Sequence, residues 1–518
     1  MSITDRKGVL VLITALTLSA VGCQSTSTPD DGSNLALQGL GVDDLRLRLE
    51  SGQYTSADIT RTYLDRIEKY DDTGPTPLHA VVDVNADALA EASTLDDERA
   101  AGTIRGPLHG IPVLIKGNIG SSELAATAGN VDLSAFRPVE DSPVVRNLRE
   151  SGAIILGTTN MSEFAWHGTF TKSSVEGTTA NIFDRELSAS GSSGGSAVAV
   201  AAGFAPIALG TDTCGSVVGP AAHAGLVGFR PSHDAISRDG VVPLSLSQDV
   251  VGPIGHSVAD AAAVADLTSG NDNGWSDSAA AIDLTSVTAA YLTWPFDARG
   301  ADPDSPDQAV RPQIRTASDA AVEALAQSGP QLVDLPELNQ EFATDVLTDS
   351  GYKDARPSID QFLSSTNAAY DPEVAAKALP SDVLTFEDVA EGSALEADTI
   401  TEWLEAPPLP NPAQDAILEK QQAGTQALTD LMAARNVDVL IYPTTPETAS
   451  AEWAGTAACG ISANTGAPSV QIPIGSTTSG LPFGLTVAAA PGQDAIALAV
   501  AAALEASVDA DISAPALP

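Results

Sequence analysis

Two Gly/Ser-rich loops, separated by a segment of small residues, are the most informative feature of this sequence. The first loop reads GSSGGS at 191–196 and the second reads GTDTCGS at 210–216. Between them, residues 196–202 predict a helix rich in Ala and Val, and residues 206–209 predict a buried strand. Glycine lets a backbone approach a ligand closely, and consecutive N–H groups in such turns form an anion-binding nest. Serines beside that nest are candidates for a nucleophile and a proton carrier, although composition alone also fits a flexible or phosphate-cradling loop.

Short apolar runs alternate with helical patterns along most of the chain. The runs that predict buried strands cover 110–116, 153–156, 206–209, 437–442 and 469–474. Helical patterns cover 86–101 and 494–506, and Thr55-Ser56-Ala57-Asp58 resembles a capping box. This alternation predicts an α/β fold with a buried, largely parallel sheet. The 518 residues suffice for one large domain or for roughly two to four ordinary ones.

The charge balance excludes one class of partner. Lys and Arg number 25 against 68 Asp and Glu, which gives a formal net charge of −43. Such a surface repels phosphates, so we expect no binding of nucleic acid. The excess acid predicts either a highly soluble shell or adaptation to salt, which screens the self-repulsion. No metal-ligand or cofactor motif occurs, so we expect no metal and no cofactor.

Residues 1–23 have the pattern of a secretory signal. A short basic start precedes an apolar run that is shorter than the about 20 residues of a membrane-spanning helix. The ending AVGC at 20–23 resembles a bacterial lipoprotein signal, which implies lipidation of Cys23 and export to a periplasmic or cell-surface site. The alternatives are an uncleaved anchor helix and an ordinary signal with an incidental cysteine. Residues 24–36 predict a flexible tether to a domain at 37–515.

Several blocks together resemble the amidase signature family. The motif PLHGIPVLIK at 107–116 and the block GTTNMSEFA at 157–165 precede the two Gly/Ser loops, which match the signature itself. GAPSV at 466–470 and GLPFGL at 480–485 resemble the C-terminal blocks of the family. The resemblance implies a single large α/β domain with a mixed, largely parallel central sheet covered by helices. Residues 265–425 are interpreted as a divergent, substrate-side region.

This resemblance implies a serine amidohydrolase with a Ser–Ser–Lys triad. Ser216 is then the acylated nucleophile, Ser192 the bridging serine on a cis peptide bond with Gly191, and Lys116 the base. A buried lysine can act as a base because desolvation lowers its pKa toward neutrality. The backbone N–H groups expected to form the oxyanion hole are those of Thr213, Cys214, Gly215 and Ser216.

Three residues near the triad depart from the family pattern. Gly117 follows the lysine where the family usually has Asp, Cys214 replaces a common Gly, and Val218 stands where Arg is common. We expect Cys214 to be a small side chain in the place of Gly rather than a thiol nucleophile, because no His pattern accompanies it. Cys459 is expected to be a buried small residue, and the three cysteines indicate no disulfide framework.

Other functions compete with this hypothesis. Residues 191–195 also satisfy the G-x-S-x-G nucleophile elbow, but no apolar strand precedes them and the last histidine is His256. From another class, the alternative is a lipid-anchored binding protein with an inactive amidase fold. The segment 237–249 resembles the branch with secreted peptide amidases, so the expected substrate is a small-molecule or peptide amide. Export excludes the aminoacyl-tRNA amidotransferase branch, which needs cytoplasmic tRNA.

Overall fold

The described part of the chain omits the predicted targeting signal and nearly all of the predicted tether. The computed structural model describes residues 35–74, 76–270, 273–296, 310–364, 368–370, 384–450, 458–508, 510 and 512–517. The predicted lipidation site, Cys23, therefore lies outside the described residues. Within these ranges, the search for a helix long and apolar enough to cross a membrane finds none.

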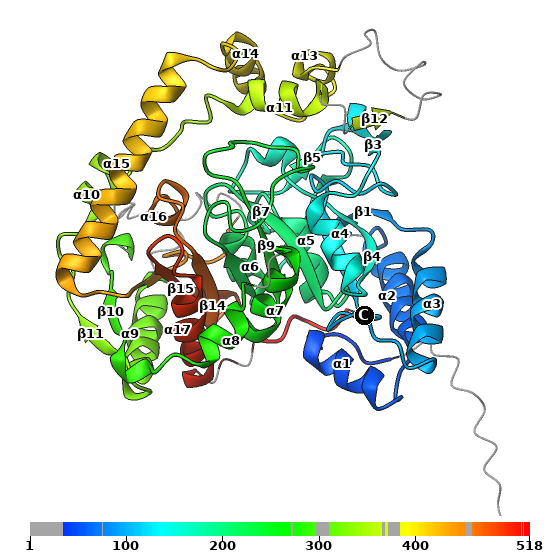
Figure 1. Cartoon of the computed structure of the whole chain (residues 1–518), viewed down its shortest axis with the longest axis horizontal. Helices are drawn as coiled ribbons and strands as arrows, with labels where there is room; N and C mark the ends of the chain where they lie inside the picture. Colours follow the sequence, from blue (N-terminus) through cyan, green and yellow to red (C-terminus); the bar gives the residue numbers. More distant parts are fainter. Residues whose placement is uncertain are drawn as a thin grey trace, which may run out of the picture.

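A sheet of 11 strands runs through the middle of the molecule (Figure 1). Its strands, in spatial order, are β1 (Val81–Val84), β4 (Ile154–Thr159), β2 (Pro112–Lys116), β7 (Ile207–Asp212), β9 (Val250–Gly255), β8 (Val227–Arg230), β14 (Ser469–Ser476), β15 (Pro482–Ala489), β13 (Val439–Pro443), β10 (Thr288–Tyr291) and β11 (Gln331–Val333). Strands β4, β2 and β7 are parallel, whereas β9 is antiparallel to both β7 and β8. The predicted α/β fold with a mixed central sheet in one large domain is confirmed.

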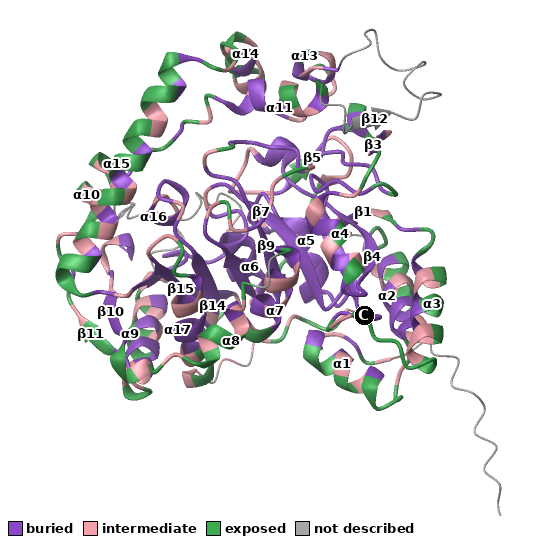
Figure 2. Cartoon of the chain, in the orientation of Figure 1, coloured by how far each residue is buried: buried purple, intermediate pink, exposed green. Residues whose placement is uncertain are grey.

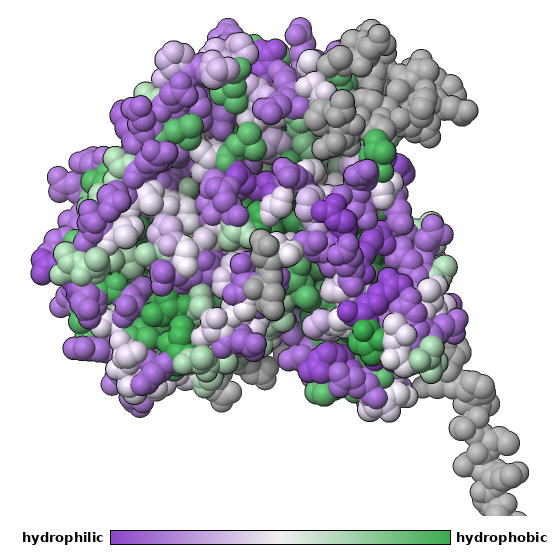
Figure 3. Space-filling view, viewed as in Figure 1, coloured by the Kyte–Doolittle hydropathy of each residue, from purple (hydrophilic) through white to green (hydrophobic). Residues whose placement is uncertain are grey.

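Helices cover this sheet on the outside. Those that contact its strands are α3 (Ala88–Ala100), α4 (Pro143–Glu150), α5 (Gly194–Ala201), α6 (Val218–Ala224), α7 (Val258–Thr268), α9 (Arg311–Gln327) and α17 (Asp494–Ser507). Further helices are α1 (Val42–Glu50), α2 (Ser56–Tyr70), α8 (Trp275–Ala280), α10 (Gln340–Asp345) and α16 (Gly460–Ala463). Figure 2 shows the central strands and α5 buried, with exposed residues on the outer helices. Hydrophilic side chains cover most of the face shown in Figure 3, as the acidic composition predicts.

Local sequence signals place several of these elements. The predicted capping box is confirmed, because Thr55 Oγ1 accepts from Asp58 N at 3.1 Å and Thr55 N donates to Asp58 Oδ2 at 3.2 Å. The run at 110–116 becomes β2, and the Ala/Val segment after the first Gly/Ser loop becomes α5. Every residue of α5 is buried, so only small side chains allow this helix to pack closely against β7 and β9.

Part of the divergent middle region forms a cap that shares an apolar core with residues 126–165 and 242–244. It contains α11 (Ala355–Ser364), α13 (Phe386–Val389), α14 (Ala397–Glu405) and α15 (Pro412–Arg435), which lie along one side in Figure 1. Phe386 and Trp403 pack against Phe164 with ring centroids 5.5 and 6.4 Å apart. Short strand pairs complete the structure: β3 (Phe136–Pro138) with β12 (Ala368–Tyr370), and β5 (Lys172–Ser173) with β6 (Gly177–Thr178). The cap thus packs on the block at 157–165, which contains Phe164.

Candidate active site

Lys116 ends strand β2 inside the protein. Its side chain is fully buried, and Nζ donates to Ser192 Oγ at 2.7 Å and to Thr211 Oγ1 at 2.8 Å. Burial lowers the pKa of Lys116 to about 7, because desolvation outweighs the opposing charges of Asp212 and Asp249. A lysine with this pKa is largely neutral just above neutral pH, which a general base requires.

The first Gly/Ser loop brings Ser192 to this lysine. The Gly191–Ser192 peptide bond is cis, as the resemblance predicts. A Cβ on Gly191 would lie 2.3 Å from Phe170 O and 2.5 Å from His167 O, so no larger residue fits there. Ser192 O in turn accepts from Ser162 N at 3.1 Å, which links this loop to the block at 157–165. Local packing thus fixes the position of Ser192.

The second Gly/Ser loop carries Ser216; its residues 210–212 form the end of β7, and the turn follows them. Ser193 joins the two loops: its N donates to Ser216 O at 3.3 Å and its Oγ donates to Thr211 O at 3.1 Å. Ser216 is 3% exposed. Its Oγ has no hydrogen-bond partner among the described residues, so the contact between Ser192 and Ser216 is not formed in this structure. Catalytic hydrogen bonds are often open in the absence of substrate.

Asp212 shapes the nucleophile loop, residues 212–217. Its carboxylate accepts from Gly215 N at 2.8 Å and from Val217 N at 2.7 Å. The Gly215 N–H therefore points to Asp212 and is not available to an oxyanion. Gly215 has φ of 91°, a conformation that favours glycine. Of the four predicted donors, three keep an N–H without a protein acceptor in the described structure: Thr213, Cys214 and Ser216.

Comparison with known proteins decides the family. Residues 58–498 match the sequence model described as Amidase. The chain belongs to the amidase family. It is a hydrolase that acts on amide C–N bonds, as its amidase neighbours do. The α/β fold and the order of the sequence blocks agree with this membership.

Proteins similar to this amidase include an amidotransferase subunit and several solved hydrolase structures. The catalogued glutamyl-tRNA(Gln) amidotransferase chain of Synechococcus sp. (strain CC9311) is 33% identical over 501 residues, covering 91% of this chain and 97% of the relative. The native peptide amidase from Stenotrophomonas maltophilia has a TM-score of 0.77 and 30% identity, covering 92% of this chain and 98% of its own. A 6-aminohexanoate cyclic dimer hydrolase, with a TM-score of 0.69 and 22% identity, shares the fold.

Gly117 does not leave the lysine of this amidase without support. Thr211 Oγ1, which accepts from Lys116, also accepts from Asn118 Nδ2 at 3.1 Å. Asn118 Nδ2 also donates to Val242 O at 3.2 Å, in the segment that resembles secreted peptide amidases. A chain of neighbouring polar groups thus orients Lys116 without a carboxylate at position 117. Thr211 and Asn118 were not identified from the sequence, although Thr211 lies within the second Gly/Ser loop.

A buried arginine from another strand supports the nucleophile loop of this amidase. Arg230, at the end of β8 and only 1% exposed, donates to Asp212 Oδ1 at 2.8 Å and to Asp212 O at 2.6 Å. Its Nη2 also donates to Gln248 O at 2.7 Å. Asp249 accepts from Thr213 Oγ1 at 2.6 Å, and burial raises the pKa of Asp249 to about 6. The pair of Arg230 and Asp212 could not be identified from the sequence, because it forms only where β7 and β8 end at the same edge of the sheet.

The prediction for the cysteines of this amidase is wrong. Cys214 and Cys459 form a disulfide with Cα atoms 5.1 Å apart, across a sequence separation of 245 residues. Both are only partly buried, so Cys459 is not the buried small residue expected. A pairing between distant cysteines cannot be read from spacing. Two cysteines besides Cys23, in a chain with a predicted export signal, are nevertheless an indication of it.

One group of potential metal ligands occurs in the described residues. It consists of Asp72, His79 and Glu176, and it includes none of the predicted catalytic residues. His79 Nδ1 contacts Glu176 Oε1 at 3.0 Å, so the histidine already has a protein partner. This surface cluster has no evident connection with amide hydrolysis.

Proposed function

We propose that this amidase is a serine amidohydrolase in which Ser216 is the nucleophile, Ser192 the proton relay and Lys116 the base. The observation that carries the proposal is the 2.7 Å contact between Lys116 Nζ and Ser192 Oγ in a fully buried setting. Serine is a poor nucleophile until a base removes its proton. A lysine with a pKa of about 7 supplies that base near neutral pH.

The reaction proceeds in two steps. Lys116 Nζ takes the hydroxyl proton of Ser192, which takes that of Ser216, and Ser216 Oγ bonds to the carbonyl carbon. The C–N bond then breaks and the proton returns through Ser192 to the leaving nitrogen, so ammonia or an amine departs. Water then adds to the acyl carbon and gives its proton to Lys116 through Ser192. The Ser216 Oγ–C bond breaks, that proton returns to Ser216 Oγ, and the acid product leaves as a carboxylate after losing its own proton to solvent. No cofactor enters either step.

The oxyanion of each tetrahedral intermediate is assigned to the nucleophile loop. The N–H groups of Thr213, Cys214 and Ser216 lack protein acceptors in the described structure, whereas that of Gly215 is bound to Asp212. Removing one donor of this kind typically costs about 10²–10³ in rate. Asp212 therefore has a positioning role, since it sets the turn that orients the other donors.

Peptide amides are the substrate class that we favour. The similar structures include a peptide amidase in complex with the competitive inhibitor chymostatin, with a TM-score of 0.76 and 30% identity to this chain. The segment that resembles secreted peptide amidases supplies Val242 O to Asn118 and the Leu244 and Ser245 N–H groups to Asp249. Small aliphatic and aryl amides are the alternative substrates.

A second candidate is a component of a tRNA-dependent amidotransferase, which the 33% identity to the glutamyl-tRNA(Gln) amidotransferase chain favours. The net charge of −43 argues against it, because tRNA is a polyanion. The disulfide argues against it as well, because disulfides persist in oxidising compartments and are rare in the cytosol. Glutamine cleaved in preference to peptide amides by the isolated chain would favour this candidate.

We also propose that the protein is exported and held to a bacterial membrane by a lipid on Cys23. The lipoprotein-like ending at 20–23 motivates the proposal. The disulfide adds support, since it uses the other two of the three cysteines and leaves Cys23 without a partner of its own chain. Formation of that disulfide is expected after export.

Labelling by a fluorophosphonate tests the catalytic proposal. The probe forms a bond between phosphorus and an activated serine Oγ and releases fluoride. Intact mass should show one adduct on the wild type, none on Ser216→Ala and a slower adduct on Lys116→Ala. Lys172→Ala, at an exposed lysine, is the matched control and should label at the wild-type rate. No adduct on folded wild type would instead favour a binding protein with an inactive amidase fold.

A further inference from the structure

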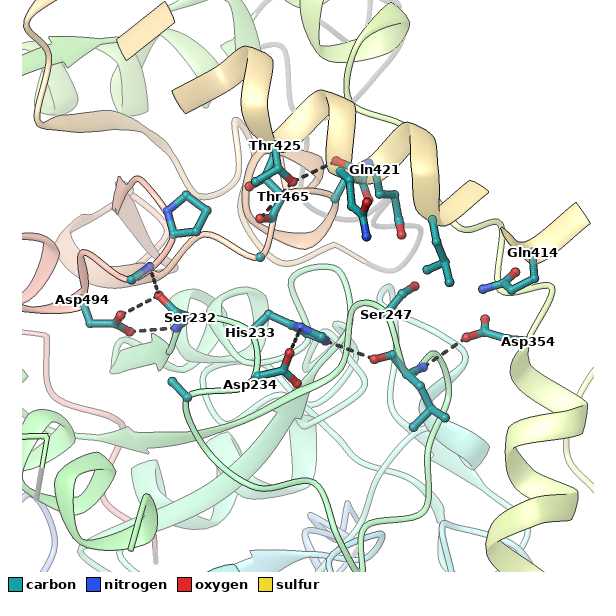
Figure 4. Close-up of a pocket in the computed structure, with 18 of the residues that line it drawn as sticks. Ser232, His233, Asp234, Ser247, Asp354, Gln414, Gln421, Thr425, Thr465 and Asp494 are labelled. Atoms are coloured by element: carbon teal, nitrogen blue, oxygen red, sulfur yellow. Dashed lines mark hydrogen bonds and ion pairs between the residues drawn. The ribbon is translucent and has the colours of Figure 1, made fainter. Parts of the chain in front are cut away.

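A large cavity lies beneath helix α15, and we call it the α15 cavity. Its volume is about 930 Å³ (Figure 4). Its walls come from α15, from the loops after β8 and β15, and from residues 464–466, which follow α16. None of the three proposed triad residues lines it. The size is that of a pocket for a small peptide rather than for a single amide group.

Three buried polar atoms of this cavity lack a hydrogen-bond partner. They are Gln414 Oε1, Gln421 Nε2 and Asp354 Oδ1, on side chains that are 4%, 7% and 3% exposed. A buried polar atom without a partner costs about 1–3 kcal/mol, so native structures rarely keep one without a reason. Figure 4 shows Gln414 and Gln421 extending from the helix toward Asp354 and the loop opposite. Together they offer one donor and two acceptors to a ligand.

The spacing of the two glutamines suits an extended chain. Gln414 and Gln421 are seven residues apart and therefore share one face of α15 with Leu418, which also lines the cavity. Seven residues of helix rise about 10 Å, which is the length of about three residues of extended peptide. A peptide backbone carries both N–H donors and C=O acceptors at such intervals, as this set of unpaired atoms requires.

The α15 cavity opens at the same edge of the sheet as the proposed triad. Strands β7 and β8 both pair antiparallel with β9, so they are parallel to each other. Ser216 follows the end of β7, while Ser232 and His233 of the cavity follow the end of β8. Two strand spacings separate these ends, roughly 10 Å. Leu246 lines both the α15 cavity and a much smaller cavity that contacts Thr211 and Asn118.

The charges around the cavity restrict its occupant. Its lining includes four carboxylate residues and neither Lys nor Arg; the acids are Asp234, Asp354, Asp415 and Asp494. Asp494 is occupied by Ser232 N and Oγ, at 2.8 and 2.5 Å. Asp234 is paired with Arg238, so Asp354 and Asp415 are the acids left. The remaining acids favour a neutral or cationic chain and disfavour an acidic one.

We propose that the α15 cavity is a substrate subsite that holds the main chain of a peptide amide a few residues away from the scissile bond. This inference rests on the proposed function, because it names the substrate class of the same active site. Gln421 Nε2 donates to a substrate carbonyl, while Gln414 Oε1 and Asp354 Oδ1 accept from its N–H groups. The cavity thus makes a peptide of several residues a better substrate than a single-residue amide.

Turnover of a length series tests the subsite. N-acetylated alanine amides of one to five residues are compared by kcat/KM for the wild type and the double variant Gln414→Leu/Gln421→Leu. In the wild type we expect kcat/KM to rise at least tenfold from one residue to four. The double variant should lose most of that ratio through KM, since two hydrogen bonds worth about 1 kcal/mol each correspond to roughly thirtyfold. Gln426→Leu, on the exposed face of the same helix, should keep the wild-type ratio.

Binding without turnover separates this proposal from the catalytic one. The acetylated tetra-alanine amide is titrated calorimetrically into Ser216→Ala, with and without the two glutamine substitutions, and thermal melts check that each variant is folded. Weaker binding only when the glutamines are replaced supports the subsite, even if no amide is hydrolysed and the catalytic proposal fails. The subsite proposal is overturned if both proteins bind the peptide equally well. It is also overturned if the wild-type kcat/KM does not change with peptide length. Neither result contradicts the catalytic proposal. An acetylated glutamate-rich tetrapeptide amide that binds as well as the alanine peptide contradicts the charge argument.

Discussion

Cys214 and Cys459 are joined by a disulfide that ties the nucleophile loop to the start of α16, 245 residues further along the chain. Cys214 lies two residues before Ser216 and provides one of the backbone N–H groups assigned to the oxyanion hole. The bond therefore links the catalytic loop to the C-terminal part of the sheet. It fixes by a covalent bond a turn that Asp212 and the positive φ of Gly215 also stabilise.

Breaking this disulfide should lower both stability and activity. For Cys459→Ser we expect a loss of about 2–4 kcal/mol in the free energy of unfolding, as is typical when a native disulfide is removed. We also expect a lower kcat with little change in KM, because the oxyanion donors are oriented by the loop. Urea unfolding and steady-state kinetics measure the two effects. Ser462→Ala, on the same short helix, is the control; a variant that kept wild-type kcat would show that the disulfide does not position the loop.

Loss of one partner of the buried ion pair between Asp212 and Arg230 should lower stability more than loss of the disulfide. Arg230→Met leaves the Asp212 carboxylate, 0% exposed, without its cation. Removing one partner of a buried pair costs about 3–5 kcal/mol. The double variant Arg230→Met/Asp212→Asn should be less destabilised than the single one, because it removes the uncompensated charge. Equal unfolding midpoints for wild type and Arg230→Met in urea would contradict this account.

Local sequence patterns predicted the elements that carry the proposed triad. The apolar run that ends in Lys116 became β2, and the two Gly/Ser loops lie at either end of α5 and β7. Glycine is required at 191 because a Cβ there would lie only 2.3 Å from Phe170 O and 2.5 Å from His167 O. Its presence in the sequence was therefore informative. The strand and helix patterns can be read from the sequence because they depend on neighbouring residues, whereas the need for glycine at 191 arises from residues 167 and 170.

The supporting contacts could not be predicted because they join distant parts of the chain. Arg230 reaches Asp212 only because β7 and β8 are parallel with β9 between them. The middle region gave no clear pattern, since its apolar side chains pack on the loop around Phe164 rather than on a helix of their own. The α15 cavity is likewise formed by a helix and loops that meet only in the folded chain.

Activity should depend on pH through Lys116. Its pKa is lowered from the ordinary value of 10.5 to about 7 by burial, and only the neutral amine can accept the proton of Ser192. We therefore expect kcat/KM to rise tenfold per pH unit below about 7 and to level off above it. The profile is measured on a neutral amide whose own groups do not titrate in this range. An activity that fell as pH rose from 6 to 8 would exclude neutral lysine as the base.

The N-terminal signal gives a prediction independent of the catalytic site. Expressed in a bacterium that processes lipoproteins, the full chain should sediment with membranes and incorporate labelled palmitate. Cys23→Ser should lose the label, because it removes the predicted site of the lipid. Cys459→Ser should keep the label, which controls for loss of a cysteine as such. An unmodified tryptic peptide that spans Cys23 in the mature wild type would disprove lipidation.

Thr211 should act on the reaction through Lys116 rather than by contact with substrate. Its Oγ1 accepts from Lys116 Nζ at 2.8 Å and from Asn118 Nδ2 at 3.1 Å. Thr211→Val removes this acceptor with little change in volume, so the lysine is less well placed and its charged form less stabilised. We expect kcat to fall by up to about tenfold, because a hydrogen bond that orients the neutral amine is worth roughly 0.5–1.5 kcal/mol. The pH profile should shift to lower pH, because loss of an acceptor favours the neutral amine. Thr211→Ser should restore both the rate and the profile, whereas an unshifted profile in Thr211→Val would mean that the residue only maintains packing.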